Sequence, residues 1–432
     1  MNPAPNGVAF LKGRDDYVVM ILRVSPLLSG IVLVLILHMP TVSAQTPSDS
    51  LTHVLGAEYA AGPLRSFFLG DHWRSAWTTP LTAPVLDMEE PGARWTVLRE
   101  GGGIHTHKLH LRDAGGRRYL FRAINRDPAL VWRPDLRKAV VTRAMLDQIT
   151  TQLPFAAVVA AVLERAVGLD AARPRIVALP DSPSLGVFRR DFAGLVGTLT
   201  PQPADDTADA DGIYRSVVGT YAMFEHLERS GAQQVDARMF AVARLMDILL
   251  GDWDRDAEQW RWRRIAQRGR TIWTPLPDDR DQAFCLFDGI IPSVVERVVL
   301  PLNGYDNPFP NITSLTWTGR HLDRRLLSSL TRSTWDSLAA MIVGKLDDEV
   351  IARAVSRLPS TWQENIAPRL FAHIRQRRSQ LHALAAEYGR LLNVCVDVHG
   401  SMDDENVTVL RDADGSVVVN LTRGMHAPTF NR

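Results

Sequence analysis

Two acidic segments, separated by a short hairpin-like stretch, limit what this sequence can fold into more than any other feature. The first, GDWDRDAEQ at residues 251–259, directly follows the apolar stretch DARMFAVARLMDILL at 236–250. The second, DDRDQAF at 278–284, directly follows TIWTPLP at 271–277. Apolar residues at helical spacing predict a buried helix over 236–250, and the glycine after it is typical of a helix end. The alternation in WRW at 260–262 predicts a strand that pairs with 271–277. Such a hairpin would bring both acidic segments to the same end of one substructure.

Carboxylates gathered in one place repel each other unless a cation or basic groups lie among them. Two interpretations follow. The first is a solvated acidic turn that is neutralised by the nearby arginines, namely Arg255, Arg261, Arg263, Arg264 and Arg280. The second is a phosphate and metal site. Phosphoryl transfer needs one loop with an Asp for the substrate proton and an amide for a metal, and a second loop with an Asp that holds Mg²⁺.

The segment GDWDRDAEQ resembles the catalytic loop of atypical kinase-like folds, including the phosphoinositide-kinase, HipA-like, secreted casein-kinase and spore-coat CotH groups. These proteins place Asp-Arg-His in the loop, with Asn or Glu five residues after the Asp. The resemblance implies that Asp254 is the catalytic base, with Arg255 beside it. It also implies that Gln259 holds a metal. Two departures stand out: Gln259 replaces Asn or Glu, and Asp256 occupies the usual His position.

The segment DDRDQAF resembles the metal-binding Asp segment of the same folds, with Asp281 as the first choice and Asp279 as the second. Both segments are still more similar to a bacterial kinase-like family whose members carry GDWDRHEDQWRW and PIPRDRDQAF. Some members of that family are fused to calcineurin-like phosphoesterase and BamA-type outer-membrane barrel segments. The resemblance covers about residues 55–425.

The amino-terminal half supplies candidates for the phosphate-binding side of such a site. WTVLREGGGIHTHKLHLRDAGGRRYLFRAINRDP at 95–128 alternates apolar and polar residues, which predicts antiparallel strands. The turn there resembles a phosphate-covering glycine loop, although three glycines also suit an ordinary hairpin; they are Gly101, Gly102 and Gly103. Arg122 lies mid-strand where kinases keep a phosphate-binding Lys, and a surface arginine is the alternative. Further candidates are Lys108, Arg126 and, as the helix acid that pairs with the base, Asp147.

Histidine and cysteine patterns predict little chemistry. His105 and His107 are spaced to share one strand face and could bind zinc, but no third ligand is near in sequence. They are therefore interpreted, with His110, as solvated or phosphate-facing. Cys285 and Cys395 are too few for a disulfide framework, and neither lies in a CxxC motif, so both are interpreted as structural.

The amino terminus predicts export. MILRVSPLLSGIVLVLILHMPTVSAQ at 20–45 contains Arg23, an apolar run and small residues, as a secretory signal does. We predict a signal peptide over 1–44, cleaved after Ala44, with Met20 as an alternative start. An uncleaved membrane anchor is the alternative. The expected location is periplasmic or secreted, with peripheral membrane association as an option. The net charge of +1 gives no reason to expect a nucleic-acid partner.

The order of the elements, together with these resemblances, predicts an α+β chain with a two-lobed atypical protein-kinase-like fold. A β-rich lobe with a helix pair is expected over 45–212, a helical lobe with the acidic loops over 213–400, and a β-hairpin with a tail over 401–432. The expected function is phosphate transfer from ATP or another nucleotide, with Mg²⁺ or Mn²⁺, to an unidentified acceptor. Two alternatives stay open: a non-catalytic module that binds or assembles a cell-envelope protein, and a metal-dependent phosphoester hydrolase.

Overall fold

The computed structural model describes most of the chain. The described residues are 8–12, 18–22, 50–90, 92–101, 106–125, 147–203, 217–267, 269–300, 302–306, 310–413, 415, 417–423 and 430–431. The chain forms two units, residues 1–48 and 49–432. In the first unit, β1 (Val8–Lys12) pairs in antiparallel fashion with β2 (Val18–Leu22). The rest of the predicted signal segment, with Ala44, lies outside the described residues.

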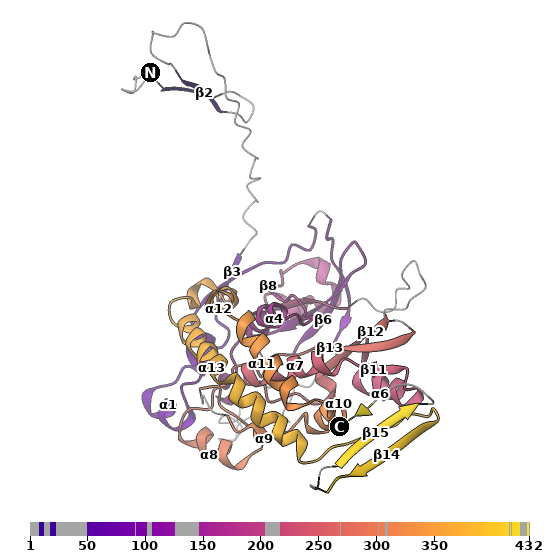
Figure 1. Cartoon of the computed structure of the whole chain (residues 1–432). Coiled ribbons are helices and arrows are strands. Elements are labelled where there is room, and N and C mark those ends of the chain that lie inside the picture. Colours follow the sequence, from indigo (N-terminus) through magenta and orange to yellow (C-terminus); the bar gives the residue numbers. More distant parts are fainter. Residues whose placement is uncertain are drawn as a thin grey trace, which may run out of the picture. The chain divides into compact units, whose positions relative to one another are not determined.

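The amino-terminal part of the second unit is built on a five-stranded antiparallel sheet (Figure 1). In spatial order its strands are β5 (Thr96–Glu100), β6 (Lys108–Arg112), β7 (Arg118–Ala123), β9 (Val196–Pro201) and β8 (Arg175–Ala178). The predicted strand meander is therefore confirmed. A further pair consists of β3 (Ser50–His53) and β4 (Leu81–Pro84).

The two faces of the five-stranded sheet have opposite chemistry because side chains alternate along each strand. One face contributes Leu109, Leu111, Phe121 and Leu199 to a buried apolar cluster. The other face carries Lys108, His110, Leu120, Arg122 and Thr198, which line pockets instead. The alternation thus places two basic strand residues on the pocket side of the sheet.

Helices pack around this sheet and precede it. They are η1 (Ala57–Tyr59), α1 (Pro63–Leu69), α2 (Arg74–Thr78), η3 (Gln148–Thr151), α4 (Ala156–Ala166), η4 (Pro183–Phe188) and α5 (Arg189–Phe192). The stretch Gln148–Ala166 is long and apolar enough to cross a membrane, but 67% of its most apolar window is buried inside the protein. Its composition therefore matches that of a core helix.

A second sheet carries the hairpin between the two acidic segments. Its strand order is β10 (Val217–Gly219), β12 (Trp260–Gln267), β13 (Arg270–Pro277) and β11 (Gln233–Val235). The indoles of Trp260, Trp262 and Trp273 are fully buried. The rings of Trp260 and Trp262 lie 5.0 and 5.3 Å from the Phe240 ring of α7 (Ala237–Leu250), centroid to centroid. Aromatic packing therefore fixes the hairpin against the predicted buried helix.

The remaining chain is mainly helical and encloses α7, with α11 and α13 packed against it (Figure 1). These helices are α6 (Thr220–Arg229), η5 (Ala257–Gln259), α8 (Ile290–Val298), α9 (Ile312–Leu315), α10 (Arg320–Leu327), α11 (Arg332–Lys345), α12 (Asp348–Val355), η6 (Ser360–Trp362) and α13 (Ile366–Asn393). The chain then forms β14 (Glu405–Arg411), β15 (Val417–Arg423) and β16 (Phe430–Asn431), which confirms the predicted carboxy-terminal hairpin.

The structure corrects two expectations about secondary structure. The sequence at 175–195 suggests two strands, but only β8 forms, and η4 and α5 follow it. The side chain of Ser182 accepts a hydrogen bond from the Ser184 amide, and Pro183 starts η4, so local capping favours the helical turn. The single helix expected over 324–344 is split because Thr331 caps α11.

Gly251 provides a test of how α7 ends. Its φ of 66° is left-handed, which costs other residues about 1–2 kcal/mol, and a Cβ there would lie 2.6 Å from Cδ2 of Tyr305. We expect Gly251→Ala to lower the free energy of unfolding in urea by about 2 kcal/mol or more. Gly344→Ala is the control, because its Cβ would meet nothing within 4 Å, and it should gain about 0.5–1 kcal/mol. Equal stability of the Gly251 variant and the wild type would contradict this account.

Candidate functional site

The first acidic loop starts where α7 ends. Every residue of α7 from Phe240 to Leu250 is buried, and Gly251 turns the chain out of the helix. The amide of Asp252 then donates to the carbonyl of Asp247 at 2.9 Å. The loop therefore projects from a rigid core element, which is the setting that a precise site requires.

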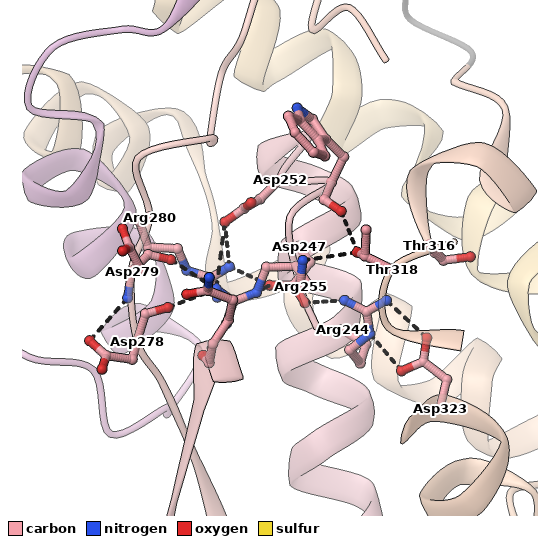
Figure 2. Close-up of polar contacts among 12 residues, drawn as sticks. Arg244, Asp247, Asp252, Arg255, Asp278, Asp279, Arg280, Thr316, Thr318 and Asp323 are labelled. Carbon is pink, nitrogen blue, oxygen red and sulfur yellow. Dashed lines mark hydrogen bonds and ion pairs between the residues drawn. The ribbon is translucent and has the colours of Figure 1, made fainter. Parts of the chain in front are cut away.

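Arg255 ties the two acidic loops together from inside (Figure 2). Its side chain is fully buried, and its guanidinium donates to the carbonyls of Asp278 and Asp279, at 2.7 and 2.8 Å. It also donates to the carbonyl of Gln259 at 3.0 Å, and it lies 4.5 Å from the centroid of the Trp260 ring. Arg255, which the sequence groups with the catalytic residues, is thus placed to position both loops.

A buried ionic network surrounds Arg255 (Figure 2). The Asp247 carboxylate pairs with Arg244 at 2.5 Å, with Arg255 at 3.3 Å and with Arg280. Arg280 also binds Asp252, at 2.9 Å, and Glu164 of α4, at 2.9 Å from Nε. Burial alone would raise the pKa of Asp247, but the charges of the three arginines outweigh it and lower that pKa. The network therefore joins α4, α7 and both acidic loops.

Asp254 has the electrostatic environment of a general base. Its pKa is raised to about 6, first by burial and then by the negative charges of Asp252 and Asp256. A carboxylate with a pKa near the working pH can accept a proton and release it again. The predicted role of Asp254 is consistent with this environment.

Asp256, which departs from the usual His, has a local structural role. Its carboxylate accepts a hydrogen bond from the Glu258 amide at 2.8 Å and caps η5. The short helix ends at Gln259, whose carbonyl accepts from the Asp278 amide at 3.1 Å. Asp256 therefore shapes the turn that brings Gln259 beside the second acidic loop.

The second acidic loop faces the basic side of the five-stranded sheet. Asp279 has a left-handed φ of 47°, and its carboxylate forms an ion pair with Arg122. The amides of Asp279 and Asp281 donate to the carboxylates of Asp278 and Asp279, at 3.0 and 3.4 Å. Burial would raise the pKa of Asp279, but Arg122 and a hydrogen bond with Asp281 lower it below its usual value. The loop therefore keeps Asp279 ionised.

Lys108 and Arg122 form the opposing basic pair. They are directly opposite each other on β6 and β7. Burial and the charge of Arg122 lower the pKa of Lys108, although Asp279, Asp281 and Asp278 act in the opposite direction. Lys108 and Arg122 thus share one acidic neighbourhood, as groups that bind phosphates beside a metal do.

Three pockets meet at this point. The central pocket is lined by Lys108, Arg122, Thr220, Gln259, Asp278 and Asp279, among others. The inner pocket lies between β7, β9 and α4, and includes Leu120, Phe155, Thr198 and Asp281. The outer pocket extends from Leu98 of β5 to Leu276 of β13. Asp278 lines all three pockets, so the acidic loop is their common wall.

Other predicted site residues have different outcomes. The amide of Gly101 donates to the carbonyl of Lys108 at 2.7 Å, which closes the hairpin. Gly102, Gly103, Arg126 and His105 lie outside the described residues. Asp147 pairs with Arg74 at 2.8 Å and with Arg65 at 2.5 Å, so the pairing with Arg122 expected from the sequence is not observed. Glu164 was missed, although it is the one carboxylate in the apolar α4 sequence.

The acidic donors were tested for their fit to a divalent cation. Within the described part of the chain, no group of three or more His, Cys, Asp or Glu side chains is placed to hold a metal. Mg²⁺ generally takes only one or two carboxylates, with waters and substrate phosphates completing its shell. Asp279 and Asp281, with the amide of Gln259 nearby, therefore fit a cation that binds together with a phosphate better than one that binds alone.

Comparison with known proteins gives kinase-type structures. The proinflammatory kinase CtkA of Helicobacter pylori has 12% identity and a TM-score of 0.34, over 66% of this chain and 94% of that chain. HipA of Shewanella oneidensis MR-1, in complex with HipB and operator DNA, has 12% identity and a TM-score of 0.32, over 70% and 68%. The Golgi casein kinase has 10% identity and a TM-score of 0.33, over 82% and 88%. No family model and no curated protein matches the chain.

The order of elements agrees with the predicted fold class independently of these low scores. Protein kinases follow a glycine turn with a basic strand residue, a helix acid, a catalytic loop and a metal-binding Asp segment. The chain has Gly101, Arg122, Glu164, Asp254 and Asp279 in that order, on a sheet-rich part followed by a helical part. The α+β, kinase-like fold class is confirmed.

Arg280 allows the network to be tested. Removing its charge leaves Glu164, Asp247 and Asp252 with too little positive charge in a buried place, which typically costs about 3–5 kcal/mol. We expect Arg280→Met to lower the free energy of unfolding by that order. Combining it with Glu164→Gln should restore part of the loss, because one uncompensated carboxylate is removed. Additive losses in the double variant would contradict the pairing.

Asp254 allows the strain in the first loop to be tested. An Asp has a pKa of about 3.9 in the unfolded chain, whereas the pKa of folded Asp254 is about 6. Its ionised form therefore destabilises the fold fully above the folded pKa, and this penalty disappears below the unfolded pKa. We expect Asp254→Asn to raise Tm near pH 7.5, with a smaller gain near pH 5. Asp191→Asn, at an exposed site on α5, is the control. An unchanged Tm near pH 7.5 would refute the strain.

Proposed function

We propose that the protein is an exported phosphotransferase that uses a nucleotide, such as ATP, with Mg²⁺ or Mn²⁺. The observation that carries the proposal is the basic pair Lys108 and Arg122 facing the Asp278–Asp281 loop, across a pocket that also contains Gln259. Basic side chains on one wall and carboxylates on the other suit a polyphosphate and its cation together. A merely solvated acidic turn does not explain the buried tie through Arg255.

The residues divide the chemistry between them. Lys108 and Arg122 bind phosphate oxygens, and Asp279 and Asp281, with Gln259, would hold the cation. The cation, when bound, neutralises charge that develops on the phosphates. Asp254 takes the proton of the acceptor hydroxyl as its oxygen forms the new bond to the terminal phosphorus. The bond from that phosphorus to the bridging oxygen breaks, and the nucleoside diphosphate leaves.

The ion pair between Arg122 and Asp279 gives this arrangement a resting state. Arriving phosphates attract Arg122, and an arriving cation attracts Asp279. Each ligand therefore weakens the ion pair that the other must replace. Nucleotide and cation should consequently bind better together than either does alone.

Ligand-dependent stabilisation tests the proposal. A ligand specific to the folded state adds about 2.7 kcal/mol at a hundred times its dissociation constant. We expect ATP with Mg²⁺ or Mn²⁺ to raise the Tm of the full chain, more than the separate shifts combined. Asp279→Asn should remove the effect because it removes the charge that faces the cation. Asp336→Asn, at an exposed position on α11, should keep it.

The same measurement separates the alternatives. Stabilisation by the cation alone, with turnover of a phosphoester and no acceptor, would favour a metal-dependent hydrolase. A fold that ignores both ligands would refute the phosphotransferase and favour a binding module of the cell envelope. The second outcome would agree with the capping role of Asp256 in place of the usual His.

A further inference from the structure

The outer pocket has an unusual charge for a site beside a nucleotide. Five arginines and one histidine line it, against two aspartates; the basic residues are Arg99, His110, Arg118, Arg173, Arg261 and Arg263. Small-molecule sites are generally lined by apolar side chains with only a few polar groups. A strongly basic lining therefore calls for an anionic ligand.

The basic residues reach the pocket from both sides of the cleft. On the five-stranded sheet, Arg99 lies opposite His110 across β5 and β6, so both point to the same face as Lys108. On the second sheet, Arg261 and Arg263 alternate with the buried Trp260 and Trp262. Strand alternation thus turns two basic rows toward one space.

Acidic partners neutralise only part of this charge. Arg263 pairs with Asp170, and Arg261 lies 3.9 Å from Asp278. Both aspartates of the lining are therefore engaged by β12. Burial and then the charges of Arg99, Arg118 and Lys108 lower the pKa of His110, which agrees with a positive local field.

The middle of the pocket has a different character. Leu98 and Leu276 lie in the lining, together with Pro201, Pro203 and Pro277. An apolar centre with a basic rim suits a ring system that carries a phosphate away from the reacting one. Because Asp278 and Arg261 also line the central pocket, one ligand can extend through both.

We propose that the outer pocket recognises a second phosphate group, so that the cleft takes a small molecule with phosphates at two separate ends. One end reaches Lys108 and Arg122, and the other reaches Arg99 and Arg173. The source is a nucleotide with an additional ribose phosphate or a polyphosphorylated ring alcohol. The placement of the first phosphate rests on the proposed function, whereas the second phosphate site does not.

Matched probes test the second site in the full-length chain. Adenosine 3′,5′-bisphosphate and adenosine 5′-monophosphate differ by one phosphate, and inositol hexakisphosphate lacks the base. A hydrogen-bonded charge pair contributes enough for roughly a tenfold change in affinity. We expect the bisphosphate or the inositol phosphate to bind at least about tenfold tighter than the monophosphate in calorimetric titrations.

The variant Arg99→Glu/Arg173→Glu should remove this advantage, because it reverses two exposed charges at the rim without touching the central pocket. Arg190→Glu, which also reverses a highly exposed arginine, is the control and should keep the advantage. A preference for the bisphosphate would identify a nucleotide, and tight binding of the inositol phosphate alone would identify a ring alcohol. Both outcomes support a second phosphate site.

Two results would overturn the inference. One is equal affinity for monophosphate and bisphosphate with no binding of the inositol phosphate. The other is tight polyphosphate binding that the double charge reversal leaves unchanged, since the ligand would then bind elsewhere. Either result is compatible with stabilisation by ATP and Mg²⁺ that Asp279→Asn removes. Conversely, loss of that stabilisation with retained bisphosphate binding would refute only the phosphotransferase.

Discussion

The buried ion pairs around Asp247 are the constraint on which the rest of the site depends. Charged groups lose their hydration when buried, so a fold tolerates them only when each has close partners of opposite sign. Here the partners come from four places in the chain: α4, α7 and the two acidic loops. None of these elements can shift far without separating charges in a medium that does not screen them. The network therefore sets the relative position of the loops before any ligand arrives.

Strand alternation supplies the other half of the site at little structural cost. The same strands that bury Leu109 and Phe121 must present their intervening residues on the opposite face. Lys108, Arg122 and the outer arginines are those intervening residues. On the second sheet, the buried tryptophans set Arg261 and Arg263 outward by the same rule. The core and the basic rows are thus two consequences of one pattern.

The sequence predicted the parts of this site that local pattern controls. The hairpin expected between the acidic segments exists, and the pairing of Trp260 with Pro277 is what brings Gln259 beside Asp278. The position of Arg122 opposite the acidic loop also follows from its strand. What sequence pattern could not reveal was the pairing of buried charges. Asp147 and Glu164 are both acids near a helix, and only the tertiary packing decides that Asp147 meets Arg74 while Glu164 meets Arg280.

The inward direction of Arg255 was hidden for the same reason, and it has a consequence for how such sites change over generations. Its guanidinium binds main-chain oxygens, which every residue possesses. The side chains at 259, 278 and 279 carry no part of that bond. Substitutions there can exchange one ligand type for another while the loops stay joined. A lineage with this frame could pass from transferring a group, to cleaving it, to merely holding it, without ever having to refold.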